Sequence, residues 1–385
     1  MRRVLFISVL MFAVAAPAAA QLGKLGQAVG KLSKAKSLAD QIKDLVITEQ
    51  EEKDMGAAIS TRLRQKYGVV QDAAVHKYVS LVGRVVASSS TRPNLTWTFI
   101  VLDTDGVNAF AAPGGFVHIT RGALALIADE AELAGVLGHE ITHITAKHTI
   151  NAIKNKKLSG AAVEAATRSN VLEFMLDAAY ANLLENQYDR DDENESDQVG
   201  IRIANKVGYA PAGLGAFFTR LSDRNKDLKE PSGVFASHPE TKDRVSKLAK
   251  QITSEKLNAT ATVAARYKAT ISYKPVAVTV VAGAAGASSL TGSTGSTATP
   301  TTTTAKPADT STTSTAKPPA SSSKFGLGGV TSKLGADKTN TGTVASAGSR
   351  GVNPDRDAKG GSNPARVTVT LTPAEIAAFR KGISG

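Results

Sequence analysis

Residues 139–143 read HEITH, inside the run GVLGHEITHITAKHT. This motif constrains the fold more than any other feature, because two histidines four residues apart share one face only if the stretch is helical. Asp129 and Glu132, ahead of the motif, predict a capped start for that helix. Such a histidine pair can bind one zinc ion. The motif alone leaves an alternative open, an ordinary amphipathic helix whose histidines are satisfied polar groups.

A zinc site needs a third protein ligand, and one route to it is closed. The pattern HExxHxxGxxH takes a later histidine from the same helix, but Ala146 and Thr149 stand where its glycine and last histidine would be. His148 lies about 140° around a helix from His143, so we expect an ordinary surface or core histidine there.

An acidic run downstream offers another route. Residues 189–200 read DRDDENESDQVG, and Glu193 and Asp197 lie four apart on one face of a helix predicted over 193–207. Glu193 would bind the metal, and Asp197 would accept the N–H of a ligand histidine. Glu140, between the paired histidines, would take a proton from the attacking water. The alternative for an acidic run by itself is a solvated helix face.

Four segments together resemble one protein family: NAFAAPGGFVHITRGAL (108–124), ELAGVLGHEITHITAKH (132–148), YDRDDENESDQVGIRIANKVGYAP (188–211) and SHPETKDRV (237–245). The chain resembles the zinc metalloendopeptidases that include the heat-shock protease HtpX, the CAAX prenyl proteases and the periplasmic protease BepA. Its exported form is most similar to the BepA-like branch. With the helices expected over 48–85, the resemblance covers most of residues 48–254.

The resemblance implies one zinc ion per chain, bound by His139, His143 and Glu193. It implies Glu140 as the general base and Asp197 as the support of a ligand histidine.

Further residues enter through the same resemblance. His238 would cap the metal or stabilise the reacting carbonyl group, with Arg244 beside it; the alternative for His238 is a loop histidine before a helix. The strand over 116–120, which includes Phe116, Val117 and His118, would bind an extended substrate by β-addition. The alternative for that strand is a plain edge strand.

The implied fold is an α+β, mainly helical zincin-type domain with a small mixed or antiparallel sheet bordering the cleft, and a disordered C-terminal extension. The expected segments are a signal peptide (1–20), an amphipathic helix and linker (21–47), the metallopeptidase domain (48–270), a possible strand and boundary (271–287), a Ser/Thr/Pro/Gly-rich disordered linker (288–365) and a strand–helix tail (366–385).

The N-terminus and the composition bear on location and partners. A positive start, an apolar stretch from Val4 to Ala16 and small residues up to Ala20 predict export with cleavage near Ala20, to the periplasm or outside the cell. The absence of cysteine excludes disulfides and thiolate metal sites. The net charge of +12 comes without a nucleic-acid motif, so we interpret it as a solubility feature. The basic helix over 22–46 leaves weak association with a membrane surface open.

These observations favour a periplasmic zinc endopeptidase that cuts unfolded or misassembled envelope proteins, with outer-membrane proteins among the candidate substrates. The alternative is a chaperone-like or adaptor module with the same fold and little proteolysis. The intact Glu140 argues against an inactive enzyme, because only hydrolysis needs that base.

Overall fold

A computed structural model describes residues 45–155, 168–185, 188–226, 241–277 and 360–383. The expected signal peptide, most of the N-terminal helix and His238 lie outside these ranges. The chain divides into one unit of residues 1–285 and 344–385 and a second of residues 286–343. Every described residue belongs to the first unit.

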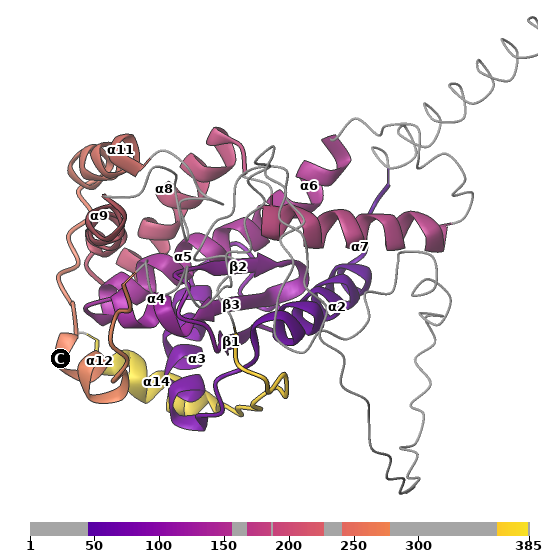
Figure 1. The fold of residues 1–385 in the computed structure, drawn as a ribbon. Coiled ribbons are helices and arrows are strands. Elements are labelled where there is room, and N and C mark those ends of the chain that lie inside the picture. The colour runs from indigo at the N-terminus through magenta and orange to yellow at the C-terminus, as the bar shows by residue number, and fades with distance from the viewer. Residues whose placement is uncertain (1–44, 156–167, 186–187, 227–240, 278–359, 384–385) are drawn as a thin grey trace, which may run out of the picture. The chain divides into compact units, whose positions relative to one another are not determined.

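The described chain is mainly helical with one small sheet (Figure 1). In chain order its elements are α2 (Glu49–Tyr67), α3 (Ala73–Ala87), β1 (Thr98–Leu102), β2 (Ala109–Ala112), the 3-10 turn η1 (Pro113–Gly115), β3 (Phe116–Thr120), α4 (Arg121–Leu126), α5 (Glu130–Thr145), α6 (His148–Asn155), α7 (Arg168–Glu185), α8 (Arg190–Lys206), α9 (Gly213–Asn225), α11 (Thr241–Ser254), α12 (Ala264–Thr270) and α14 (Pro373–Lys381). None of the helices in the described ranges has the length and apolar character needed to cross a bilayer.

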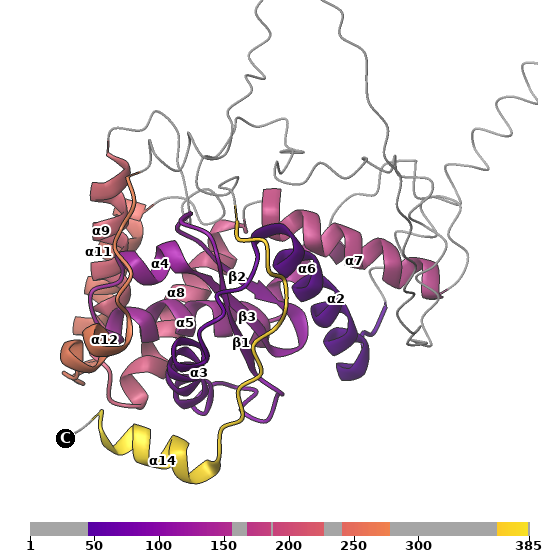
Figure 2. The same cartoon turned by 60° about the horizontal axis from the view of Figure 1, so that its bottom comes forward.

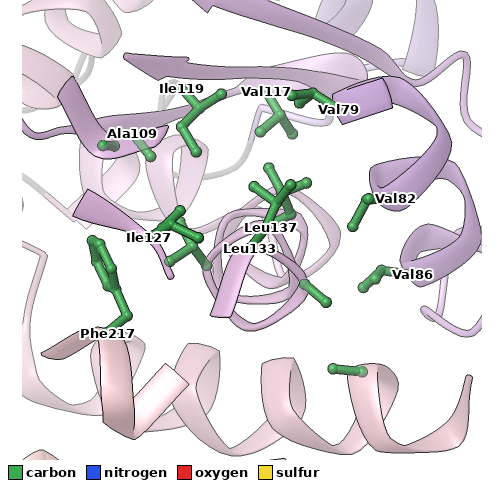
Figure 3. Close-up of a cluster of buried hydrophobic side chains, with 14 of the residues drawn as sticks. Val79, Val82, Val86, Ala109, Val117, Ile119, Ile127, Leu133, Leu137 and Phe217 are labelled. Carbon is green, nitrogen blue, oxygen red and sulfur yellow. The ribbon is translucent and has the colours of Figure 1, made fainter. Parts of the chain in front are cut away.

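The motif helix α5 lies at the centre of the core. Its start is capped as predicted, because the Asp129 side chain accepts a hydrogen bond from the Glu132 N–H. Leu133 and Leu137 are fully buried, and around them gather aliphatic and aromatic side chains from α3, β3 and α9 (Figure 3). Burying a leucine side chain contributes about 1.5–3 kcal/mol, so this packing firmly sets the direction of α5. The histidines that follow on the same helix are therefore held by the hydrophobic core.

The sheet is mixed, with strand order β1-β3-β2. β3 is the central strand, parallel to β1 and antiparallel to β2. The turn between β2 and β3 requires glycine, since Gly114 and Gly115 have φ values of 72° and 97°. The turn is formed by the Pro-Gly-Gly sequence of Pro113–Gly115.

Because both edges of β3 are already hydrogen-bonded, the prediction that Phe116, Val117 and His118 bind substrate by β-addition is wrong. All three side chains are buried, and the His118 ring forms a 2.9 Å hydrogen bond with the Ser60 hydroxyl in the core. The alternative of a plain edge strand is wrong for the same topological reason.

Two glycines allow α5 and α8 to pack closely. A Cβ atom on Gly138 would lie 2.7 Å from the Gly200 carbonyl oxygen, and one on Gly200 would lie 2.8 Å from the His139 nitrogen. Any larger side chain would push the two helices apart. The carboxylates of α8 therefore reach the histidines of α5 only because this contact has no side chains.

The C-terminal segment docks on the domain. Gly361 donates its N–H to the Asp103 carbonyl (2.7 Å), and Val69 donates to the Asn363 carbonyl (2.7 Å). Residues 360–365, which we predicted within a disordered linker, are thus bound to the domain; residues 278–359 lie outside the described ranges. The expected strand over VTVTL is not formed, and residues 271–277 also form no strand.

The tail ends in α14, which packs on α3 (Figure 2). The predicted tail helix is formed, and Thr372 and Glu375 form a capping box with Pro373 in the first turn. The Arg266 guanidinium lies 4.0 Å from the centroid of the Phe379 ring, and Ile383 is buried. The predicted domain boundary at residue 270 therefore leaves out a part of the chain that completes the core.

We predict that deleting residues 360–385 lowers the melting temperature. Loss of the buried Ile383 alone costs about 2 kcal/mol, which corresponds to roughly 4–8 °C for a domain of this size. Thermal unfolding followed by circular dichroism measures the change. The control is deletion of residues 288–343, whose Ser/Thr/Pro/Gly-rich composition predicts no contribution to a core and which should leave the melting temperature unchanged. Equal melting temperatures for both deletions would contradict a stabilising role of the tail.

Candidate metal centre

Three predicted residues converge at one point. His139 and His143 come from α5 and Glu193 from α8, and one ligand atom from each lies within 4.8 Å of the others. The two Nε2 atoms are 3.0 Å apart, and the Glu193 carboxylate oxygens lie 3.7 Å from His139 Nε2 and 3.4 Å from His143 Nε2. All three side chains are buried. Two imidazoles and a carboxylate form the three-ligand set of catalytic zinc sites.

Asp197 holds the first histidine. Its Oδ1 lies 3.0 Å from His139 Nδ1, so the ring can donate its Nδ1 proton to the carboxylate and present Nε2 to the site. Burial disfavours the charged imidazole, but the hydrogen bond to Asp197 and the charge of Glu193 raise the pKa of His139 above its ordinary value. The geometry matches the role that the sequence predicted for Asp197.

Arg244 holds the two carboxylates. Its Nε and one terminal nitrogen lie 2.7 and 2.6 Å from the Asp197 oxygens, and the other terminal nitrogen lies 2.8 Å from Glu193. Burial by itself would raise the pKa of Asp197, but the hydrogen bonds and charge of Arg244 keep it below the ordinary value. Arg244 is 2% exposed and rests on the Phe218 ring. It supports the metal ligands, and its predicted role beside His238 at the substrate stays a prediction.

Glu140 is buried beside the ligand histidines on α5. Burial and the negative charge of Glu140 raise the pKa of Tyr188 above its ordinary value. The place of Glu140 between the two histidines agrees with the position expected of a general base. His238 lies outside the described residues, and its predicted role stays a prediction.

Two residues that lie at the metal centre were not predicted from the sequence. Tyr188 stacks on His143 with ring centroids 3.9 Å apart, and its hydroxyl hydrogen-bonds Thr149 at 2.8 Å. His148 is buried, as one of our alternatives allowed, but its Nδ1 lies 2.9 Å from His143 Nδ1. The sequence signal for Tyr188 was its position just before Asp189, the residue that caps α8. The approach of His148 had no such signal, because a break in the helix produces it.

Comparison with known proteins agrees with this centre. Residues 73–252, which include both ligand helices, match peptidase family M48. The chain carries a peptidase family M48 domain. The site residues of α5 and α8 therefore lie within the part of the chain that defines the M48 match.

Individual relatives point the same way. A relative from Vibrio cholerae is 28% identical over 211 residues, which cover 52% of this chain and 44% of that protein. The beta-barrel assembly-enhancing protease of Escherichia coli is 24% identical over 207 residues, covering 51% of this chain and 42% of its own length. The metalloprotease YcaL of E. coli is 29% identical over 158 residues, which cover 40% of this chain and 61% of that protein. The chain thus spans less than half the length of the first two relatives.

We predict that Glu193→Gln lowers zinc occupancy strongly, whereas Glu195→Gln changes it little. Glu193 faces both histidines inside the site, while the Glu195 side chain is 55% exposed. Asp197→Ala should fall between them, since loss of a group that orients a ligand typically weakens metal binding about 10–100-fold. Zinc stoichiometry of the purified variants measures this. Loss of zinc in Glu195→Gln with retention in Glu193→Gln would show that the ligand assignment is wrong.

We also predict that Arg244→Gln destabilises the fold by about 3–5 kcal/mol, because it leaves two buried carboxylates without their cation. Denaturant unfolding of the metal-free protein measures the loss. Arg202→Gln is the matched control: Arg202 pairs with Glu255 at 2.6 Å, but both side chains are partly exposed. An exposed pair contributes at most about 1 kcal/mol. A loss in Arg244→Gln no larger than in the control would refute the role of Arg244.

Proposed function

We propose that this protein is a zinc-dependent metalloendopeptidase. The observation that carries the proposal is the convergence of His139, His143 and Glu193 from two helices in one buried cluster, with Glu140 beside it. The M48 match and the protease names of the relatives support it.

The residues present fit a zinc ion. The Nδ1 atoms of both histidines have partners in Asp197 and His148, which leaves the two Nε2 atoms and the Glu193 carboxylate to face one another. Such a set of neutral imidazoles and one carboxylate suits zinc, and we propose one ion per chain. A bound zinc ion supplies Lewis acidity, which acidifies water and polarises a carbonyl group.

The protein residues divide the remaining work. Glu140 takes a proton from the attacking water on its carboxylate and returns it to the leaving amine. Asp197 and Arg244 keep His139 and Glu193 in place throughout. His238 remains our candidate for capping the metal or stabilising the reacting carbonyl group.

The sheet topology limits where an extended substrate can pair. β3 is closed on both sides, and the outer edge of β1 is occupied where Val70 donates its N–H to the Val101 carbonyl (3.0 Å). This leaves β2, which packs beside α5. Among the described residues, the Thr149 hydroxyl contacts its Ala111 carbonyl at 3.5 Å, a weaker contact that an incoming strand would have to displace. We propose β2 in place of β3 as the strand that guides substrate.

For the biological role we propose cleavage of unfolded or misassembled envelope proteins in the periplasm, with outer-membrane proteins as candidate substrates. The export pattern of residues 1–20 and the names of the assembly-enhancing proteases support this. A chaperone-like or adaptor role is the second candidate. Retention of Glu140, which binding alone does not need, favours the enzyme.

We predict that Glu140→Gln abolishes proteolysis while zinc remains bound, because the change removes the proton acceptor and leaves the three ligands. Digestion of casein, with zinc content measured in parallel, tests both parts. Glu195→Gln is the control and should digest casein at the wild-type rate, and a chelator should stop digestion by the wild type. Normal turnover by Glu140→Gln would exclude the general-base assignment, and wild-type protein that binds zinc but cuts nothing would favour the chaperone-like role.

A further inference from the structure

A break after the motif helix brings His148 back to the metal centre. α5 ends at Thr145, Lys147 adopts a left-handed conformation with φ of 60°, and α6 begins at His148. On a continuous helix His148 would point about 140° away from His143. Instead the two rings meet edge to face, with centroids 4.9 Å apart. Lys147 is anchored at this break by an ion pair with the buried carboxylate of Glu52 (3.0 Å).

The contact determines which ring nitrogens carry protons. His143 Nδ1 and His148 Nδ1 are 2.9 Å apart, so one must donate and the other accept. His143 needs a lone pair on Nε2 to bind a metal beside Glu193, and its ring proton therefore sits on Nδ1. His148 Nδ1 must then be the acceptor.

This assignment places the proton of neutral His148 on Nε2. That nitrogen lies 3.4 Å from an Asp192 oxygen and 3.4 Å from a Glu195 oxygen, both on α8. Carboxylates can only accept hydrogen bonds when ionised, so they favour the tautomer of His148 that carries its proton on Nε2. The whole chain of donors then runs in one direction, from His143 through His148 to the acidic side chains of α8.

We propose that His148 is a positioning residue that orients His143 and fixes its tautomer for zinc. His148 orients His143 as Asp197 orients His139. Helix α8 supplies both supports: Asp197 contacts its histidine directly, and the acidic side chains near His148 act through the His148 ring. Two carboxylates share the outer end of this chain, so loss of Glu195 alone leaves Asp192 in place. The inference rests on the zinc site proposed above.

The test compares zinc affinities, measured by competition with a chromophoric chelator. His148→Phe keeps a ring but removes the acceptor, and should weaken zinc binding about 10–100-fold. His148→Asn places an amide oxygen near the former Nδ1 and should recover most of that loss. The double variant Asp192→Asn with Glu195→Gln should weaken binding by an intermediate factor, because amide side chains can donate as well as accept and no longer force the His148 proton onto Nε2.

The control is His76→Asn. His76, on α3, is also fully buried, but its ring hydrogen-bonds the Val70 carbonyl at 2.9 Å. None of the contacts described for His76 is with a metal ligand. It should leave zinc affinity unchanged even if the melting temperature of the metal-free protein falls. Melting temperatures of all the metal-free variants separate loss of folding from loss of affinity; should His148→Phe fail to fold, His148→Asn and the double variant decide.

The outcomes separate the two proposals. Wild-type protein that binds no zinc overturns the proposed function. If the wild type binds zinc and His148→Phe binds it with the same affinity, the positioning role is overturned and the zinc site stands. The same holds if His148→Phe and His148→Asn lose zinc affinity equally. A large loss in His148→Phe, recovered in His148→Asn, supports it.

Discussion

The close packing of α5 against α8 is the constraint on which the metal centre depends. Gly138 and Gly200 meet with no room for a Cβ atom on either side, so a larger residue at either position would force the two backbones apart. One helix brings the paired histidines and the other brings their carboxylates. A small shift along this contact would separate Glu193 from both rings. The glycines therefore contribute to function through packing.

Close packing alone would place negative charges in a buried space, and the structure balances them with specific partners. Arg244 spans Asp197 and Glu193, and its fork geometry suits two carboxylates at once. Removing one member of such a cluster leaves an uncompensated buried charge, which costs more than the cluster contributes. The acidic run of α8 is thus largely assigned: Asp189 caps the helix, Glu193 faces the histidines, and Asp197 orients His139.

Another buried carboxylate ties the distant C-terminal segment to the motif helix. Glu130, in the first turn of α5, accepts hydrogen bonds of 2.6 Å from Tyr78 and Tyr209 and pairs with Arg266. Burial and the charge of Glu130 raise the pKa of both tyrosines, so these hydroxyls stay protonated donors. Arg266 in turn lies against Phe379 of the tail. The helix that bears the metal ligands is therefore braced at its start by residues from both ends of the described chain.

Local sequence determined much of this protein. The helix that carries His139 and His143 and its cap at Asp129 depend on residues within a few positions, and both formed as predicted. Glu193 was found from a four-residue spacing and a family resemblance. Tertiary structure decided the rest. The order in which the strands pair makes β3 the central strand. The left-handed backbone conformation of Lys147 brings His148 back to the metal centre. Tail docking depends on contacts between residues about 300 positions apart. No local pattern encodes such contacts, because their energy exists only once distant segments have met.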